Sequence, residues 1–220
     1  MRDRLQVLTW HVHGNYMHYL SFAPHDFHLV HDAARSPGLT GRSGTLPWRA
    51  NVHEIALDAL ERARFDCVLY QSHAHYAGRE RLPAAVRALP RIILEHDPPL
   101  EHPTAQLHPM QDPSGLIVHV TPFNALMWDP GVTPSTVIEH GVALLAPARY
   151  DGSIARGLVV INDLGTRGRR LGGDLYAHAR DRIALDLVGM HSEPLGGLGE
   201  IENAALPSFM ARYRFFFNPI

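Results

Sequence analysis

Residues that could bind an anion are concentrated in the segment 157–176. An apolar run suited to a buried strand opens the segment, and helical spacing of apolar residues resumes at its end. Between these elements, Arg167, Arg169 and Arg170 offer planar guanidinium groups that match phosphate oxygens. Glycines such as Gly172 permit close backbone approach, and the following helix would add free N–H groups. The segment predicts an anion-binding loop, although a solvated basic connection between strand and helix explains the same residues.

Histidine is unusually common, with 16 residues in the chain. Two pairs are spaced so that both rings of a pair would face one way on a strand, as a metal site could require. No third ligand follows at a recognisable spacing, so no metal is expected. Six histidines instead follow predicted strands, where open parallel sheets bind ligands and an imidazole can donate a hydrogen bond to a sugar hydroxyl or a phosphate. These six are His11, His13, His73, His75, His96 and His140. The histidines predicted to be solvated loop residues include His25, His31, His102 and His108.

The composition is that of a soluble globular protein, with 45% hydrophobic and 19% charged residues. A formal net charge of −2 gives no global field for a nucleic-acid partner. All 20 basic residues are arginine, so a phosphate contact would use arginine, histidine or backbone N–H groups. The single cysteine, Cys67, lies in an apolar run and is predicted to be a buried structural thiol. No signal peptide or membrane-length apolar run is visible, so we expect a cytoplasmic protein.

Short apolar runs alternate with helical patterns along the chain. This alternation predicts an α/β fold with parallel strands and right-handed crossovers. Residues 33–50, 71–76 and 100–115 are expected to be loops. The predicted strands are 5–10, 27–30, 66–70, 91–95, 116–120, 136–138, 158–162, 184–189 and 214–217, and the predicted helices are 16–20, 52–63 with Asn51 as N-cap, 82–89, 122–128, 174–182 and 201–212.

The chain is long enough for two domains. Residues 143–156 lack a periodic pattern and contain Pro147 and Gly152, which favours a linker. We therefore expect a first domain at 1–145 and a second at 146–220.

Four segments resemble, in order, the motifs of one enzyme family. Leu8-Thr9-Trp10-His11-Val12-His13-Gly14 resembles its first strand and acceptor-side glycine loop, and Cys67-Val68-Leu69-Tyr70-Gln71-Ser72-His73-Ala74-His75 resembles its "D-V-V-H-A-H" strand end. Arg91-Ile92-Ile93-Leu94-Glu95-His96-Asp97 and Val137-Ile138-Glu139-His140-Gly141-Val142 resemble its "p-V-V-x-T-x-H-D" and "V-I-P-N-G-V". The segment 157–176 takes the place of its "G-R-L-x-x-x-K-G", without the lysine. The family is the GT-B glycosyltransferases of the "glycosyltransferase group 1" type.

This resemblance implies two Rossmann-like domains and retaining, metal-independent transfer of a sugar from a nucleotide-diphospho-sugar to an acceptor. No cofactor other than the donor co-substrate is implied. The catalytic residue would be His96, beside the transferred sugar. The donor diphosphate would be held by Arg167, Arg169, Arg170 and Gly172, and the base or ribose would lie near Gly189, Gly197 and Glu200. The acceptor side of the cleft would contain His11, His13, Gly14, His73, His75, Asp97, His140 and Gly141.

The sequence ends at Ile220, before the family's E-x7-E signature. We therefore expect an incomplete second domain, with weak donor binding and little turnover. Two other functions remain open from the sequence: a non-catalytic nucleotide- or sugar-binding domain, and a His-rich metallohydrolase. The acceptor could be a sugar, a lipid or a small molecule, peripheral membrane contact is possible, and the oligomeric state is open.

Overall fold

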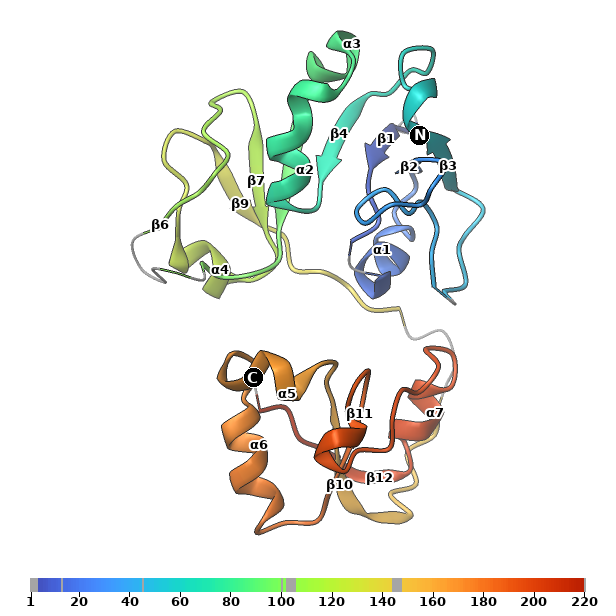
Figure 1. Ribbon diagram of the computed structural model, residues 1–220, viewed down its shortest axis with the longest axis vertical. Coiled ribbons are helices and arrows are strands. Elements are labelled where there is room, and N and C mark those ends of the chain that lie inside the picture. Colours follow the sequence, from blue (N-terminus) through green and yellow to red (C-terminus); the bar gives the residue numbers. More distant parts are fainter. Residues whose placement is uncertain are drawn as a thin grey trace. The chain divides into compact units, whose positions relative to one another are not determined.

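The computed structural model describes residues 4–12, 14–44, 46–99, 101, 106–143 and 148–219. The chain divides into two compact units, residues 1–143 and 144–220, and each is described by itself (Figure 1). The predicted domain boundary between residues 145 and 146 lies outside the described residues.

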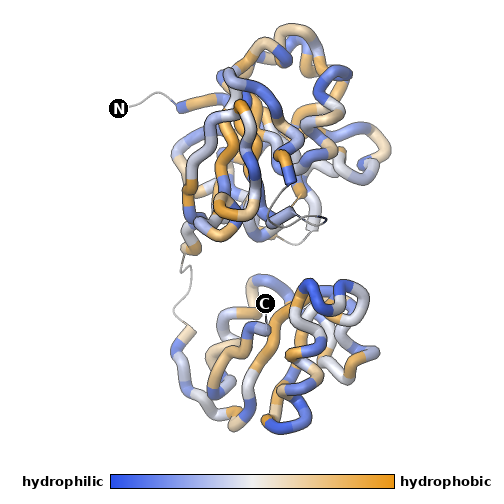
Figure 2. The backbone as a smooth tube through the Cα atoms, turned by 90° about the vertical axis from the view of Figure 1, so that its left-hand side faces the viewer, coloured by the Kyte–Doolittle hydropathy of each residue, from blue (hydrophilic) through white to orange (hydrophobic). Residues whose placement is uncertain are grey.

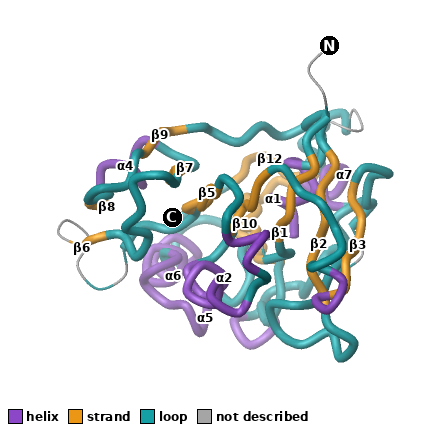
Figure 3. Tube along the Cα trace, turned by 90° about the horizontal axis from the view of Figure 1, so that it is seen from above, coloured by secondary structure: helices purple, strands orange, loops and turns teal. Residues whose placement is uncertain are grey.

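The described residues of unit 1 form a seven-stranded sheet in the order β3-β2-β1-β4-β5-β7-β9. Every neighbouring pair in this sheet is parallel, so the predicted parallel α/β architecture is confirmed for unit 1. Figure 3 shows β1, β2 and β3 side by side. Strand order runs outward from β1 in both directions, which puts the topological switch point between β1 and β4. The strands are β1 Gln6–Thr9, β2 Asp26–His31, β3 Val52–Ala56, β4 Cys67–Tyr70, β5 Arg91–Glu95, β7 Leu116–His119 and β9 Ser135–Val137.

Alternation along the strands separates two hydrophobic clusters, one on each face of this sheet. Ile93 of β5 belongs to the cluster that also contains Tyr76 and Val86 from the helices α2 and α3. Leu94, the next residue, belongs to the cluster that contains Met17 of α1. Helix α1 therefore covers one face, and α2 with α3 covers the other. Figure 2 colours the chain by hydropathy and shows short hydrophobic runs that alternate with hydrophilic ones.

Short helices connect the strands of unit 1. Two of them begin at side-chain caps: the hydroxyl of Ser72 accepts from His75 N at 3.2 Å, and that of Thr121 accepts from Asn124 N at 3.1 Å. The cap at Ser72 turns part of the predicted 71–76 loop into helix. The helical elements are α1 Gly14–Leu20, η1 Leu57–Ala59, α2 His73–Ala77, η2 Gly78–Arg81, α3 Ala84–Arg87 and α4 Pro122–Met127, and two short strands, β6 Gln106–Leu107 and β8 Trp128–Asp129, pair with each other.

The predicted helix at 52–63 is wrong. Val52–Ala56 is an edge strand paired with β2, and only the 3₁₀ turn η1 follows it. Asn51 does not cap a helix, because its side-chain amide donates to the carbonyl oxygens of Ser21 at 2.9 Å and His25 at 2.7 Å. Pairing with β2 outweighs the apolar stripe that suggested a helix, since tertiary context overrides local propensity.

Unit 2 contains a smaller parallel sheet in the order β11-β10-β12. The last predicted helix, 201–212, is shorter than expected because Pro207 lies in the first turn of α7, where its missing N–H is tolerated. The elements are β10 Ile154–Val160, α5 Leu164–Arg167, η3 Gly168–Leu171, α6 Gly173–Arg180, β11 Leu185–Val188, η4 Glu193–Leu195, α7 Leu206–Met210 and β12 Tyr213–Phe216. Within the described part of the chain, none of the helices has both the length and the apolar character needed to cross a membrane.

Candidate functional site

The strands of unit 1 are parallel, so their C-terminal ends share one edge of the sheet. Open parallel sheets bind ligands at this edge, outside the strand ends. His11 lies two residues after β1, His96 directly follows β5, and His140 lies three residues after β9. His73 is the first residue of α2, three residues after β4. The structure therefore brings most of the predicted cleft histidines to one edge, whereas His13 lies outside the described residues.

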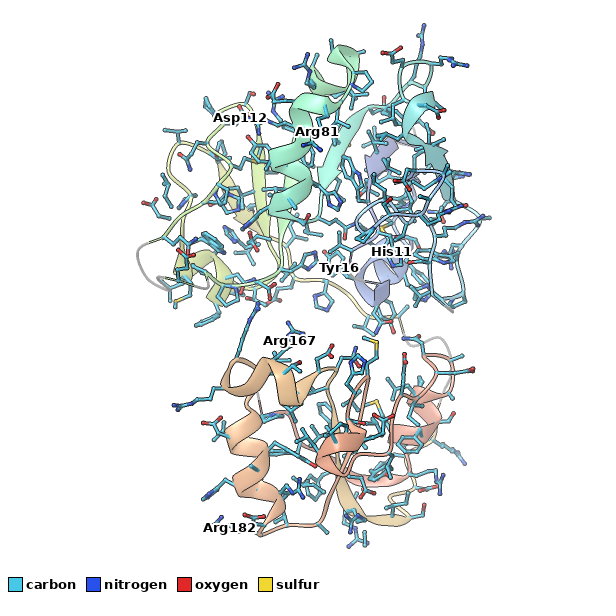
Figure 4. All side chains as sticks on the ribbon, in the orientation of Figure 1. His11, Tyr16, Arg81, Asp112, Arg167 and Arg182 are labelled. Atoms are coloured by element: carbon cyan, nitrogen blue, oxygen red, sulfur yellow. The ribbon has the colours of Figure 1, made fainter. Side chains whose placement is uncertain are left out.

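A pocket of about 620 Å³ lies at the switch point between β1 and β4, and we call it the switch-point pocket. Segments that follow four neighbouring strands form its walls. Its lining residues are Trp10, His11, Val12, Pro37, Gly38, Leu39, Leu57, Ser72, Ala74, His75, Gly78, Arg81 and Leu82. Two of the predicted cleft residues, His11 and His75, therefore face the same pocket. Figure 4 labels His11 and Arg81, which lie on different segments of the wall.

His75 is held in one orientation in this pocket. Its Nε2 donates to the carbonyl oxygen of Gly38 at 2.9 Å, and its Nδ1 therefore accepts from the hydroxyl of Ser72 at 2.8 Å. The imidazole stacks on Trp10, with ring centroids 4.9 Å apart. Burial lowers the pKa of His75, and so the ring is neutral at pH 7. A neutral, oriented imidazole provides polar contacts in the pocket without adding charge.

A buried carboxylate lies at the end of β5. Glu95 is 5% exposed, and its Oε2 accepts from Nε2 of His73 at 2.5 Å and from Nε2 of His108 at 3.1 Å. Its Oε1 accepts from the backbone N–H of Asp97 at 3.0 Å. Burial alone would raise the pKa of Glu95, but the hydrogen bonds from His108 and His73 outweigh it and hold the pKa at about 2. Glu95 is therefore ionised at neutral pH, and we call these three side chains the carboxylate cluster.

The spacing of the carboxylate cluster would also suit a metal ion, because one ligand atom from each residue lies within 4.8 Å of the others. The tautomer of His108 argues against this reading. Its Nδ1 accepts from the backbone N–H of Met110 at 3.0 Å, so in the neutral ring Nε2 carries the proton. A metal would need the lone pair of Nε2, because it binds neutral imidazole at the unprotonated nitrogen. In this arrangement, hydrogen bonds rather than a metal ion therefore hold the cluster together.

His119 extends this cluster into the interior. It pairs in register with Glu95 across β5 and β7, so both side chains point to the same face of the sheet. His119 is fully buried, and neither of its ring nitrogens has a hydrogen-bond partner among the described residues. Burial lowers the pKa of His119, although Glu95 acts in the opposite direction. A neutral ring is the form that such burial favours.

His96 and His140 gather around a different side chain. The ring of Tyr16, on α1, meets His96 edge-on at 4.5 Å between centroids and His140 at 5.3 Å. A second pocket of about 410 Å³ is lined by Tyr16 together with residues 138–143, which include His140 and Gly141. Burial raises the pKa of the Tyr16 hydroxyl further above neutral pH, where a tyrosine hydroxyl is a hydrogen-bond donor.

The remaining predicted cleft residues have backbone roles. Gly14 begins α1. Asp97 has an exposed side chain, but its carbonyl oxygen accepts from the indole N–H of Trp128 at 2.8 Å and its N–H donates to Glu95. The bond to Glu95 attaches the segment after β5 to the carboxylate cluster, and the bond from Trp128 attaches it to β8.

In unit 2, the Gly/Arg segment forms a helical turn and a 3₁₀ turn between β10 and α6. Arg167, Arg169 and Arg170 are exposed, and Arg169 pairs with Asp174 at 3.0 Å. Gly172 has a φ of +67°, and a Cβ there would lie 2.2 Å from the carbonyl oxygen of Pro219. Contact with the chain backbone is thus one reason for glycine at this position. The arginines are left accessible to an anion.

The residues predicted for the donor base or ribose follow β11. Gly189 has a φ of +137° and lies against the backbone of Ile161, and Gly197 packs against Ser192. Glu200 is exposed. Asp163, after β10, and His191, after β11, form a hydrogen bond of 2.6 Å, and both residues have left-handed backbone. The hydrogen bond that His191 donates to Asp163 raises the pKa of His191.

Sequence reasoning named His73 but missed Glu95 and His108, the other two residues of the carboxylate cluster. His108 was expected to be solvated, but it is 1% exposed, and this prediction is wrong. It lies in a loop with no periodicity, and its contact with Glu95 depends on the path of that loop. His102 lies outside the described residues. A glutamate at the end of an otherwise apolar strand was the available signal for Glu95, because a carboxylate in a buried strand requires partners.

No protein-family model matches this chain, and no curated protein matches it.

Proposed function

We propose that this chain belongs to a glycosyltransferase that moves a sugar from a nucleotide-diphospho-sugar to an acceptor. Unit 1 would be the acceptor-side Rossmann-like domain, and unit 2 would be part of the donor-binding domain of a GT-B fold. The observation that carries the proposal is the row of oriented polar side chains after β1, β4, β5 and β9, where a parallel sheet binds ligands. The segments that resemble the family's motifs end just after these same strands.

The proposed donor site is the Gly/Arg segment of unit 2. Arg167 and Arg169 are exposed, and Arg169 has 89% of its side chain in solvent. Its pairing with Asp174 is a surface ion pair, which contributes about 1 kcal/mol or less, so a diphosphate could displace it at low cost. Guanidinium groups would stabilise the negative charge that develops on the leaving nucleoside diphosphate.

The proposed transfer uses electrostatics in place of a metal. His96, beside Tyr16, would donate a hydrogen bond to the transferred sugar. The acceptor oxygen would form a bond to the anomeric carbon as the bond from that carbon to the diphosphate breaks, and the proton of the acceptor hydroxyl would pass to the departing diphosphate oxygen. Retention of configuration is implied by the family resemblance and is part of the proposal.

Thermal unfolding with added nucleotides tests the donor site. The full chain is heated with UDP, GDP, ADP and their sugar conjugates, with and without EDTA. A ligand that binds only the folded state stabilises it by about 2.7 kcal/mol at a hundredfold excess over Kd. We expect one nucleotide to raise the melting temperature of unit 2 whether or not EDTA is present, and Arg169→Ala to abolish the shift.

Arg182→Ala is the matched control. Arg182 lies just after α6, at the opposite end of unit 2 from Arg167, and donates to the carbonyl oxygen of His178 (Figure 4). Its replacement should leave the nucleotide shift unchanged. If the chain unfolds cooperatively but no nucleotide raises its melting temperature, the proposed donor site is wrong. If EDTA abolishes the rise in melting temperature, the proposed metal independence is wrong.

A further inference from the structure

The switch-point pocket contains one formally charged lining residue, and it is a cation. Arg81 lies on η2, the helical segment that continues from α2, and no lining residue is acidic. In the described part of the chain, Arg81 has no ion pair or hydrogen bond to its side chain. The neighbouring Arg79 and Arg87 both contact Glu80, at 3.6 and 2.8 Å. Arg81 therefore keeps its full charge available for a ligand.

The other well-defined polar groups of the pocket are neutral. The hydroxyl of Ser72 hydrogen-bonds to the imidazole of His75, and the ring N–H of His75 donates to the carbonyl oxygen of Gly38. The lowered pKa of His75 keeps its imidazole uncharged at pH 7. The positive charge of Arg81 is thus not balanced by any carboxylate lining the pocket, which favours an anionic ligand.

The walls of the pocket are largely apolar. Val12 and Leu57 line it and remain 38% and 40% exposed. Covering such side chains with an apolar group is favourable because it removes hydrocarbon surface from water. The other apolar lining residues are Trp10, Pro37, Leu39, Ala74 and Leu82.

Residues from one end of the helical segment to the other line the pocket. Ser72, His75, Gly78 and Arg81 all line it, and their spacing of three residues places them on one face of the segment. The nine residues of α2 and η2, five in α-helix and four in 3₁₀ helix, rise by roughly 14–18 Å. Lining residues spread over this length, around a pocket of about 620 Å³, can accommodate an extended chain.

We propose that the switch-point pocket binds a single-chain amphiphile, an apolar chain that carries an anionic group, and that this molecule is the acceptor. Arg81 binds the anionic group, and the walls around Val12 and Leu57 bind the chain. Only the role of acceptor rests on the glycosyltransferase proposed above. The binding of the amphiphile rests on the pocket itself.

Calorimetric titration of the full 220-residue chain with decyl phosphate, kept below its critical micelle concentration, tests the proposal. Decyl phosphate should bind, whereas decanol and inorganic phosphate should each bind at least tenfold more weakly. Arg81→Gln should weaken the binding of decyl phosphate about tenfold or more, because a charge-assisted contact is lost. Leu57→Asp should weaken it as well, because it places a negative charge in the apolar wall.

Arg87→Gln is the matched control, because Arg87 is a neighbouring arginine that pairs with Glu80 and does not line the pocket. It should bind decyl phosphate like the unaltered chain. Unchanged affinity in Arg81→Gln, or equal affinity for inorganic phosphate and decyl phosphate, would overturn the proposal, as would the absence of binding. The titration contains no nucleotide, so loss of the donor site in unit 2 would not affect its outcome.

Discussion

Replacement of Glu95 by Gln should destabilise unit 1 by about 3 kcal/mol at neutral pH. The Glu95 carboxylate is 5% exposed and accepts three hydrogen bonds, from His73, His108 and the N–H of Asp97. A glutamine keeps the volume but replaces one accepting oxygen with an amide that donates. At least one of these donors would then lose its partner in a buried site.

The magnitude follows from the pKa of the Glu95 carboxyl. It falls from its usual 4.5 to about 2, because the hydrogen bonds from His108 and His73 outweigh the opposing effect of burial. A difference of about 2.5 pH units corresponds to about 3 kcal/mol. Since the folded pKa lies below the unfolded one, this stability is present above pH 4.5 and is lost as the pH falls toward 2.

Tryptophan fluorescence during urea unfolding can measure this effect in unit 1 alone. All three tryptophans, Trp10, Trp48 and Trp128, lie within residues 1–143. Glu80→Gln is the matched control, because its side chain is 67% exposed and a surface ion pair contributes about 1 kcal/mol or less. The midpoint and slope of unfolding are compared at several pH values.

The difference between the unaltered chain and Glu95→Gln should shrink to about half by pH 3. A loss below about 1 kcal/mol at pH 7 would refute the reasoning, because the hydrogen bonds would then not stabilise the ionised carboxylate. A difference that stays constant from pH 5 to pH 3 would show that the effect does not arise from the charge.

Two further predictions concern unit 2. Gly172→Ala should destabilise it by about 2 kcal/mol or more, because alanine at a φ of +67° is strained and its Cβ would meet the carbonyl oxygen of Pro219. Hydrogen exchange of the β10 amides measures this loss, and Gly165→Ala, where a Cβ meets only ordinary contacts, should not increase the exchange. NMR titration should give His191 a pKa above 6.5, and Asp163→Asn should lower it. The pair's stabilisation is present below pH 6.5 and is lost as the pH rises through the folded pKa of His191. A pKa of His191 that does not respond to Asp163→Asn would contradict the pairing.

The strands of the large sheet were largely predictable, because a short apolar run bounded by polar residues is compatible with few structures other than a strand. Residues 91–95 were predicted as a strand and form β5 with the same bounds. The edge strand β3 was not predictable in this way. Its apolar residues also fit a helical stripe, and only pairing with β2 distinguishes the two.

The amino-acid sequence by itself determined that histidines follow several strands, and parallel pairing then brings His11, His73 and His96 to one edge. Tertiary structure alone decided which of them meet. His73 reaches the buried Glu95, whereas His96 contacts Tyr16 on α1. The burial of His108 and the switch-point pocket depend on the paths of loops, which carry no periodic pattern. Contacts between such segments form only when the sheet brings their ends together, so no local feature of the sequence could reveal them.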